Sequence, residues 1–138
     1  MDKIILQCNN LRKIYKKKNH LHVACDDINL YIKQGECLGI VGESGSGKST
    51  LANIIMNLEK ADSGTVLLNN KDITNMTEKE MQNIRGNDLA MIFQDPMTSL
   101  NPLYTVGNQL TEHLIKHKKI SKKEAKEKAI KMLDMVGI

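Results

Sequence analysis

The 138-residue sequence predicts an α/β fold, with strands and helices mixed through the first two-thirds of the chain and helices alone in the last third. Ile28, Leu30 and Ile32 alternate with other residues at the two-residue period of a half-buried strand. The apolar run at residues 37–41 is typical of a strand buried on both faces, and residues 51–58 repeat apolar side chains at helical spacing. A strand that passes directly into a helix is the basic unit of α/β proteins.

Further strands are predicted on both sides of this unit. Residues 3–8 are expected to form the first strand, and the polar residues 9–21 to form a connection to the second. Residues 65–68 predict a strand between two turns, and the apolar run 89–93 predicts another.

Capping signals mark the helices. Thr77 with Glu80 forms a capping box that opens a short helix, which Gly86 can close. Ser121 with Glu124 caps the last helix in the same way. A helix between these two is marked by Val106, Leu110 and Leu114, and the buried stripe of the last helix is expected to contain Ala125, Ala129, Met132, Leu133 and Val136.

The composition excludes several classes of protein. Hydrophobic residues make up 41% and charged residues 26%, which rules out collagen-like, disulfide-stapled and strongly disordered chains. No stretch approaches the roughly 18 apolar residues of a membrane span, and the first residues contain no secretory segment, so we expect a cytoplasmic location. Cys8, Cys25 and Cys37 have no CxxC spacing and are expected to be reduced thiols.

The net charge of +4 comes from one segment. Residues 116–131 contain eight lysines and two glutamates, whereas the rest of the chain carries 12 basic and 14 acidic residues. We expect a solvated helix face here, with a contact to anionic lipid or to a partner as the alternative. The four aromatic residues are too few for base-stacking platforms, so we expect no nucleic-acid partner. His113 and His117 have the spacing of a metal-binding pair, but no third ligand is evident.

A glycine-rich loop carries the strongest chemical signal. Residues 42–49 fit the phosphate-binding pattern GxxxxGK followed by Ser or Thr. Glycine readily adopts the backbone angles that let several N–H groups meet a triphosphate, and the following helix points its positive end at the same anion. Lys48 can contact the β- and γ-phosphates, and Ser49 can ligate Mg²⁺. A merely flexible glycine turn is the alternative; the predicted nucleotide contacts are Gly42, Gly45, Ser46, Gly47, Lys48, Ser49 and Thr50.

The segment 91–107 distinguishes among phosphate-loop families. It begins Met-Ile-Phe-Gln-Asp-Pro-Met-Thr-Ser-Leu-Asn-Pro and ends Tyr-Thr-Val-Gly. This segment resembles the Q-loop of ATP-binding cassette (ABC) ATPases, in the longer form found in the peptide and nickel importers. The sequence of residues 42–49 is also similar to the phosphate loop of that importer branch. The resemblance implies an α/β P-loop NTPase core with N-terminal antiparallel strands at residues 1–94, followed by the start of an α-helical subdomain at residues 95–138.

The resemblance also assigns roles to individual residues. Tyr15 matches the aromatic residue that stacks on adenine, with an ordinary surface tyrosine as the alternative. Gln94 matches the catalytic glutamine that reaches Mg²⁺ and the attacking water, with a residue that caps a strand end as the alternative. Ser49 and Gln94 would therefore hold the metal, and the implied cofactors are ATP and Mg²⁺.

The resemblance covers the whole chain, but the chain is truncated relative to the full cassette of the family. The signature motif, the strand that ends in aspartate and glutamate, and the switch histidine are not found among the 138 residues. The implied function is the ATP-binding subunit of an importer for peptides or nickel. Its implied partners are transmembrane permease subunits and a second ATPase cassette, identical or different, at the inner face of the cell membrane.

The missing motifs change what these 138 residues are expected to do alone. Phosphoryl transfer needs positioned water and charge around the γ-phosphate. The resemblance therefore implies that members of the family hydrolyse ATP, but we do not expect this chain to do so by itself. Without the missing strand, the run 37–41 loses a neighbour, so we expect marginal stability and association. Two alternatives stay open: a truncated product that binds nucleotide weakly or not at all, and a cassette ATPase outside transport.

Overall fold

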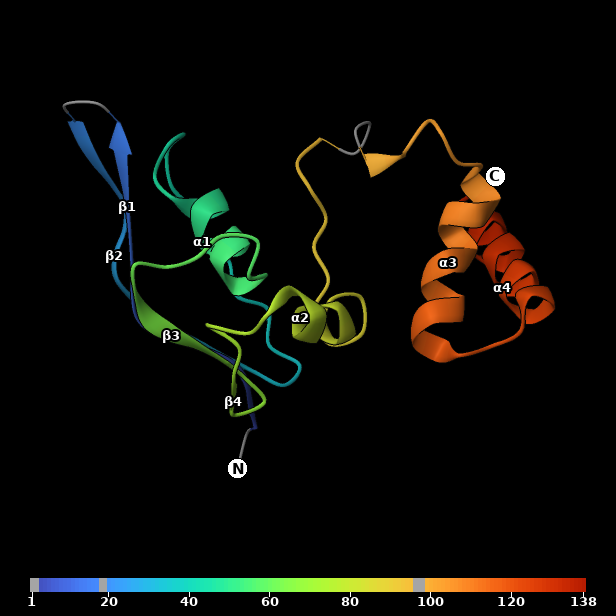
Figure 1. Cartoon of the computed structure of the whole chain (residues 1–138), viewed down its shortest axis with the longest axis horizontal. Helices are drawn as coiled ribbons and strands as arrows, with labels where there is room; N and C mark the ends of the chain where they lie inside the picture. The colour runs from blue at the N-terminus through green and yellow to red at the C-terminus, as the bar shows by residue number, and fades with distance from the viewer. Residues whose placement is uncertain (1–2, 18–19, 96–98) are drawn as a thin grey trace. The chain divides into compact units, whose positions relative to one another are not determined.

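Four strands form an antiparallel sheet in the order β2-β1-β3-β4 (Figure 1). The strands are β1 Ile4–Lys17, β2 His20–Lys33, β3 Ser63–Leu68 and β4 Lys71–Asp72. The structure is a computed structural model that describes residues 3–17, 20–95 and 99–138. Antiparallel strands therefore come both before and after the glycine loop.

The first strand continues well beyond its expected end. Residues 9–21, predicted as a polar connection, lie mostly in β1 and β2, where Tyr15 pairs with His22. Register shifts interrupt the pairing several times between Cys8 and Ile14. A bulge inserts an extra residue and breaks the two-residue period, so this half of the strand carries no alternating pattern.

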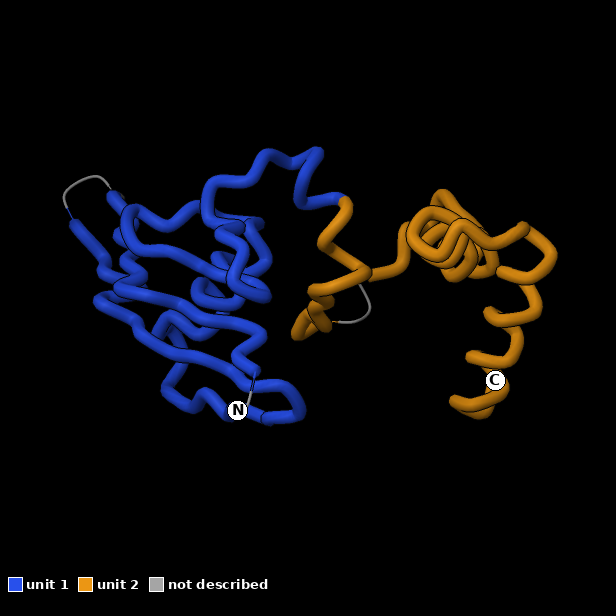
Figure 2. The backbone as a smooth tube through the Cα atoms, turned by 90° about the horizontal axis from the view of Figure 1, so that it is seen from below, with its two compact units in different colours: residues 1–82 blue, residues 83–138 orange. Residues whose placement is uncertain are grey.

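The first compact unit, residues 1–82, contains the sheet and the helix α1 Lys48–Ile55 (Figure 2). Leu51 and Ile54 are the buried residues of α1, as their helical spacing predicts, whereas Leu58 lies beyond the helix and is half exposed. The other buried apolar side chains of this unit are Leu6, Cys8, Leu11, Ala24, Cys25, Met56, Val66, Leu68, Ile73 and Met81.

The run 37–41 is not a strand, contrary to the prediction. Val41 is 95% exposed and Ile40 is 49% exposed. Within the described parts of the chain, no strand pairs with this run. A strand that is buried on both faces forms only where neighbouring elements cover it. The run therefore stays an irregular, open segment that leads into the glycine loop.

The predicted strand at residues 89–93 is also absent from the described structure. Leu89 forms an isolated parallel bridge with Arg85, and Ile92 is 94% exposed. The physical reason is the same as for the run 37–41, because an apolar pattern needs a neighbouring strand before it can form a ladder.

The second compact unit comprises residues 83–138 (Figure 2), so the boundary expected after residue 94 lies inside it. The helix α2 Glu78–Ile84 crosses the division between the units and begins at the predicted capping box. The backbone N–H of Thr77 donates to Glu80 Oε2 at 2.8 Å, and the backbone N–H of Glu80 donates to Thr77 Oγ1 at 3.4 Å. These two bonds satisfy N–H groups at the start of the helix.

Two further helices, α3 Val106–Lys118 and α4 Lys122–Met135, pack against each other within the second unit (Figure 1). The side chain of Ser121 accepts a hydrogen bond from the N–H of Glu124 at 3.2 Å, as the capping pattern predicts. Residue 137 is a glycine with a φ of +81°, which suits the turn after α4.

The buried face of α4 is narrower than predicted. Ala125 and Ala129 are buried, but Met132 is 51% exposed and Val136 is 70% exposed. Among the described elements of this unit, α3 is the helix that packs along α4. One neighbour covers one side of an apolar stripe, and the other side remains open to solvent.

Candidate functional site

The glycine loop at residues 42–47 is held against β2. Gly45 and Gly47 have φ angles of +82° and +92°, values that residues with side chains rarely adopt. A Cβ atom on Gly47 would lie 1.9 Å from the backbone oxygen of Ala24, so the position accepts no residue but glycine without movement of β2 or of the loop. The shape of the loop is therefore fixed by the strand beside it.

Lys48 lies across this loop. Its Nζ atom donates to the backbone oxygens of Gly42 and Glu43 at 2.8 and 2.7 Å, and to Ser46 Oγ at 3.1 Å. These bonds lie on the exposed side of the loop, where an anion can replace them with charge-assisted hydrogen bonds. The loop therefore carries a positive charge at its open side.

The helix α1 begins at Lys48 with an open N-terminus. Its N-cap, Gly47, makes no side-chain hydrogen bond, and its first turn contains no acidic residue. The first N–H groups and the positive end of the helix dipole therefore face outward, which favours an anion. A cavity of about 170 Å³ lies at this end and is lined by His22, Ala24, Gly45, Ser46, Gly47, Lys48, Ser49 and Thr50.

Six of the seven predicted loop residues line this cavity, and the exception is Gly42. Gly42 instead contributes its backbone oxygen to the bond with Lys48, and a Cβ atom on it would lie 2.7 Å from Ser46 Oγ. A small residue at this position lets the loop close on itself. Gly42 therefore contributes to the shape of the loop without lining the cavity.

Tyr15 is fixed beside the same helix. Its hydroxyl donates to Glu59 Oε2 at 2.6 Å and lies 3.4 Å from Thr50 Oγ1. The hydrogen bond to the Glu59 carboxylate raises the pKa of Tyr15, so the phenol stays protonated. Lys13 Nζ lies 3.3 Å from Glu59 Oε1 and 5.4 Å from the centre of the Tyr15 ring. These contacts place an aromatic ring from β1 next to the residue that follows Ser49.

Gln94 lies in the second unit and is exposed. The phosphate loop lies in the first unit. The proposed contacts of Gln94 with Mg²⁺ and water stay predictions, as does metal binding by Ser49.

Sequence reasoning missed three residues near this site. His22 and Ala24 line the cavity from β2, and Glu59 positions Tyr15. Local patterns carry no signal for them, because their placement depends on the register between two long strands and on the end of α1. The pairing of Tyr15 with His22 across the strands is the feature that would have revealed His22.

The histidine pair on α3 makes a structural contact. His113 Nε2 lies 2.6 Å from the backbone oxygen of Gly86, and the rings of His113 and His117 are 4.8 Å apart at their centres. Partial desolvation and electrostatic interactions with His113, Lys116 and Lys118 lower the pKa of His117. The described residues contain no group of three or more His, Cys, Asp or Glu side chains that could hold a metal ion.

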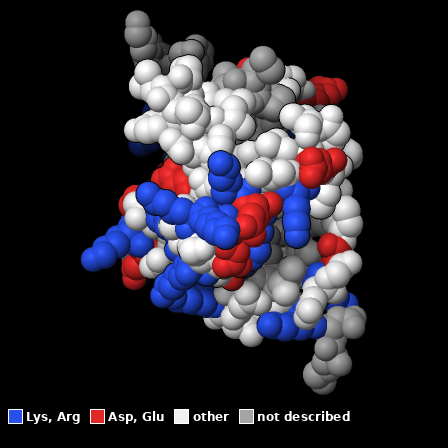
Figure 3. Space-filling model, turned by 90° about the vertical axis from the view of Figure 1, so that its right-hand side faces the viewer, with Lys and Arg blue, Asp and Glu red and all other residues white. Residues whose placement is uncertain are grey.

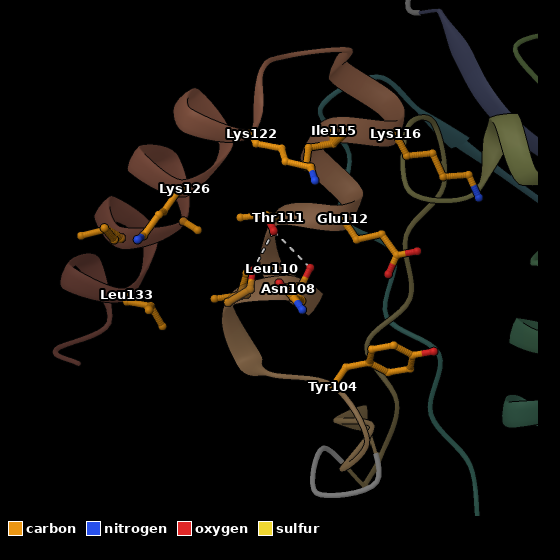
Figure 4. A pocket seen from close by; sticks show the side chains of 13 residues that line it. Tyr104, Asn108, Leu110, Thr111, Glu112, Ile115, Lys116, Lys122, Lys126 and Leu133 are labelled. Atoms are coloured by element: carbon orange, nitrogen blue, oxygen red, sulfur yellow. Dashed lines mark hydrogen bonds between the residues drawn. The ribbon is translucent and has the colours of Figure 1, made fainter.

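A second hollow of about 920 Å³ lies between α3 and α4 in the second unit (Figure 4). Leu110 and Leu133 contribute apolar side chains to it, and Lys122 and Lys126 contribute charged ones. On the side of the molecule drawn in Figure 3, Lys and Arg side chains gather near the middle, with acidic side chains between them. One ion pair, between Lys128 Nζ and Glu124 Oε1 at 3.0 Å, is exposed and contributes little to stability.

The family of the chain is shown by a family model that matches the region containing the phosphate loop. A family model described as "ABC transporter" matches residues 25–138. The chain belongs to the ABC transporter family. This match begins within β2 and includes the loop and the helices α1, α2, α3 and α4.

Relatives and solved structures agree with this assignment to the ABC transporter family. The chain is 45% identical over 138 residues to the oligopeptide transport ATP-binding protein AppD of Bacillus subtilis, and 46% identical over 139 residues to OppD of the same organism. These alignments cover 96% and 97% of this chain, but 42% and 39% of the two relatives. The chain therefore spans about two fifths of the length of the curated relatives it matches.

Among solved structures, the chain is similar to the bacterial ABC transporter cassette MJ0796. The TM-score is 0.84 at 33% identity, with 95% of this chain and 56% of that chain covered. The same cassette bound to ADP and Pi gives a TM-score of 0.82 at 32% identity. The α/β cassette fold predicted from the sequence is confirmed by these matches. None of the helices in the described parts of the chain is long and apolar enough to span a membrane.

Proposed function

We propose that residues 42–50 bind the phosphates of ATP together with Mg²⁺, and that the chain belongs to the ATP-binding subunit of a peptide importer. The observation that carries the first part is the conformation of the loop. Two glycines at positive φ, an uncapped helix N-terminus and the Lys48 ammonium all face one cavity. This combination presents backbone N–H groups and positive charge to the same anion.

Each loop residue has a distinct task in this proposal. Lys48 exchanges its hydrogen bonds to two backbone oxygens for hydrogen bonds to the β- and γ-phosphates. Its ammonium group then contacts an anion in place of neutral acceptors. Ser49 offers its hydroxyl to Mg²⁺, which prefers oxygen ligands. Thr50 follows on the same helix end and also lines the cavity.

Tyr15 and Gln94 complete the proposed site. Tyr15 stacks on adenine, and its bonds to Glu59 and Thr50 hold the ring beside the cavity. Gln94 would act as a second ligand to Mg²⁺ and would orient the attacking water. Residues 1–94 would then form the nucleotide-binding core, and residues 95–138 would begin the helical subdomain.

The transport role rests on the relatives. The relatives AppD and OppD of Bacillus subtilis are oligopeptide transport ATP-binding proteins, and DppD of the same organism is a dipeptide transport ATP-binding protein at 44% identity. These names favour peptides over nickel as the imported solute. The proposed partners are transmembrane permease subunits and a second ATPase cassette, at the inner face of the cell membrane.

A second candidate function is a fragment that binds nucleotide weakly and does not hydrolyse it. The open run 37–41 favours this candidate, because the segment that leads into the loop has no strand partner in the described structure. The signature motif and the aspartate–glutamate strand are also not found among the 138 residues, so we expect no turnover by this chain alone.

Calorimetric titration of the chain with ATP and Mg²⁺ tests the proposal. We expect Lys48→Ala to weaken binding by about tenfold or more, because a charge-assisted contact to phosphate is lost. Lys131→Ala removes the same charge from α4 and is the matched control, which should bind like the native chain. If the native chain binds no ATP at millimolar concentration, the proposal is wrong. Phosphate release that Lys48→Ala abolishes would contradict the expected absence of turnover.

A further inference from the structure

His22 and Tyr15 form a ring pair across two strands beside the phosphate loop. They are register partners of β2 and β1, and their rings are nearly parallel, with an interplanar angle of 17° and 6.5 Å between centres. Flat side chains that touch face to face have planes about 3.5 to 4 Å apart, so at this separation most of each ring face remains uncovered by the other. The two nearly parallel rings therefore lie within reach of a single planar ligand group.

This flat surface adjoins the cavity at the start of α1. His22 itself lines the cavity together with residues 45–50. Tyr15 reaches the same residues from its strand, because its hydroxyl lies 3.4 Å from Thr50 Oγ1. If a ligand places its phosphates on the loop, the part of the ligand beyond the phosphates would therefore lie next to both rings.

We infer that His22 contacts the base of the bound nucleotide and, with Tyr15, forms the surface on which the base stacks. This inference rests on the proposed binding of ATP by residues 42–50. Each base has a π-face that stacks on aromatic side chains, and an imidazole also presents ring nitrogens to the edge of a base. His22 is exposed, so its ring is accessible to a ligand. It is thus assigned as a further binding residue, contributed by β2.

Comparison of ATP with inorganic tripolyphosphate separates a contact to the base from an effect on the loop. Each ligand is titrated with Mg²⁺ into the native 138-residue chain and its variants by calorimetry. We expect His22→Ala to weaken ATP binding about three- to tenfold and to leave tripolyphosphate binding unchanged. His22→Phe keeps a flat ring and should bind ATP nearly as well as the native chain.

His20→Ala is the matched control. His20 is an exposed histidine two residues earlier in β2 and does not belong to the described lining of the cavity. It should bind both ligands like the native chain. Circular dichroism of each variant checks that the sheet is intact, and His22→Phe keeps the test valid if His22→Ala does not fold.

Three results would overturn the inference while leaving the phosphate site in place. These are equal affinity of the native chain for ATP and tripolyphosphate, unchanged ATP binding by His22→Ala, or an equal loss of both ligands in that variant. If the native chain binds neither ligand, the proposed function itself fails and the inference fails with it.

Discussion

Gly47 is the residue at which the phosphate loop depends most closely on the sheet. A Cβ atom there would lie 1.9 Å from the backbone oxygen of Ala24, at a φ of +92°. We expect Gly47→Ala to lower the free energy of unfolding by about 1–3 kcal/mol, since the loop or β2 must move. ATP binding should weaken about tenfold or more, because the N–H groups at the start of α1 lose their arrangement.

Urea unfolding and calorimetry measure these two effects, and Gly39→Ala is the control. A Cβ atom on Gly39 meets no atom within 4 Å, so this variant should resemble the native chain. Equal stability and equal ATP affinity in the two variants would show that β2 does not hold the loop.

At the residue scale, the sequence predicts the chemistry of the loop but not its surroundings. The glycines, Lys48 and Ser49 follow each other along the chain, so a pattern of eight residues contains them. His22 and Glu59 reach the site through strand register and through the turn after α1. Neither feature has a local signature, because a bulged strand loses its alternation.

At the element scale, the contribution of the capping box of α2 to stability can be tested by changing the pH. The hydrogen bonds from the Thr77 hydroxyl and backbone N–H lower the pKa of Glu80 below its ordinary value of 4.5. A carboxylate with a lowered pKa stabilises the folded state above its ordinary pKa, and this contribution is lost as the pH falls through the lowered value. We expect Thr77→Ala to cost about 1 kcal/mol at pH 7 and less at pH 3.

Urea unfolding at the two pH values checks this prediction. Thr77→Ser retains a hydroxyl at the cap and should stay close to the native chain at both. A cost of Thr77→Ala that is the same at pH 7 and pH 3 would show that the ionised Glu80 carboxylate does not contribute through the box.

Helices and strands were predicted correctly where their signals depend on residues close together in the sequence. The helix caps at Thr77 and Ser121 were predicted correctly, because each depends on a hydrogen bond that closes within four residues. The runs 37–41 and 89–93 were predicted to be strands, and the structure contradicts both. An apolar run reports that a segment can be buried, whereas a strand also needs a neighbour for its backbone groups.

At the scale of the whole molecule, each compact unit carries one of these open apolar runs. Val41 in the first unit is 95% exposed, and Ile92 in the second is 94% exposed. Extended apolar segments with unpaired N–H and C=O groups are templates for pairing with other chains.

We therefore expect the isolated chain to associate as its concentration rises, through these two runs. The double variant Val41→Lys, Ile92→Lys should remain monomeric at higher concentration, because charge on an edge segment opposes pairing. Leu103→Lys is the control, since Leu103 is 87% exposed but lies outside both runs. Sedimentation velocity over a range of concentrations distinguishes the variants. Association that Leu103→Lys suppresses as strongly would point to general surface hydrophobicity, and a native chain that stays monomeric would show that the open runs do not pair.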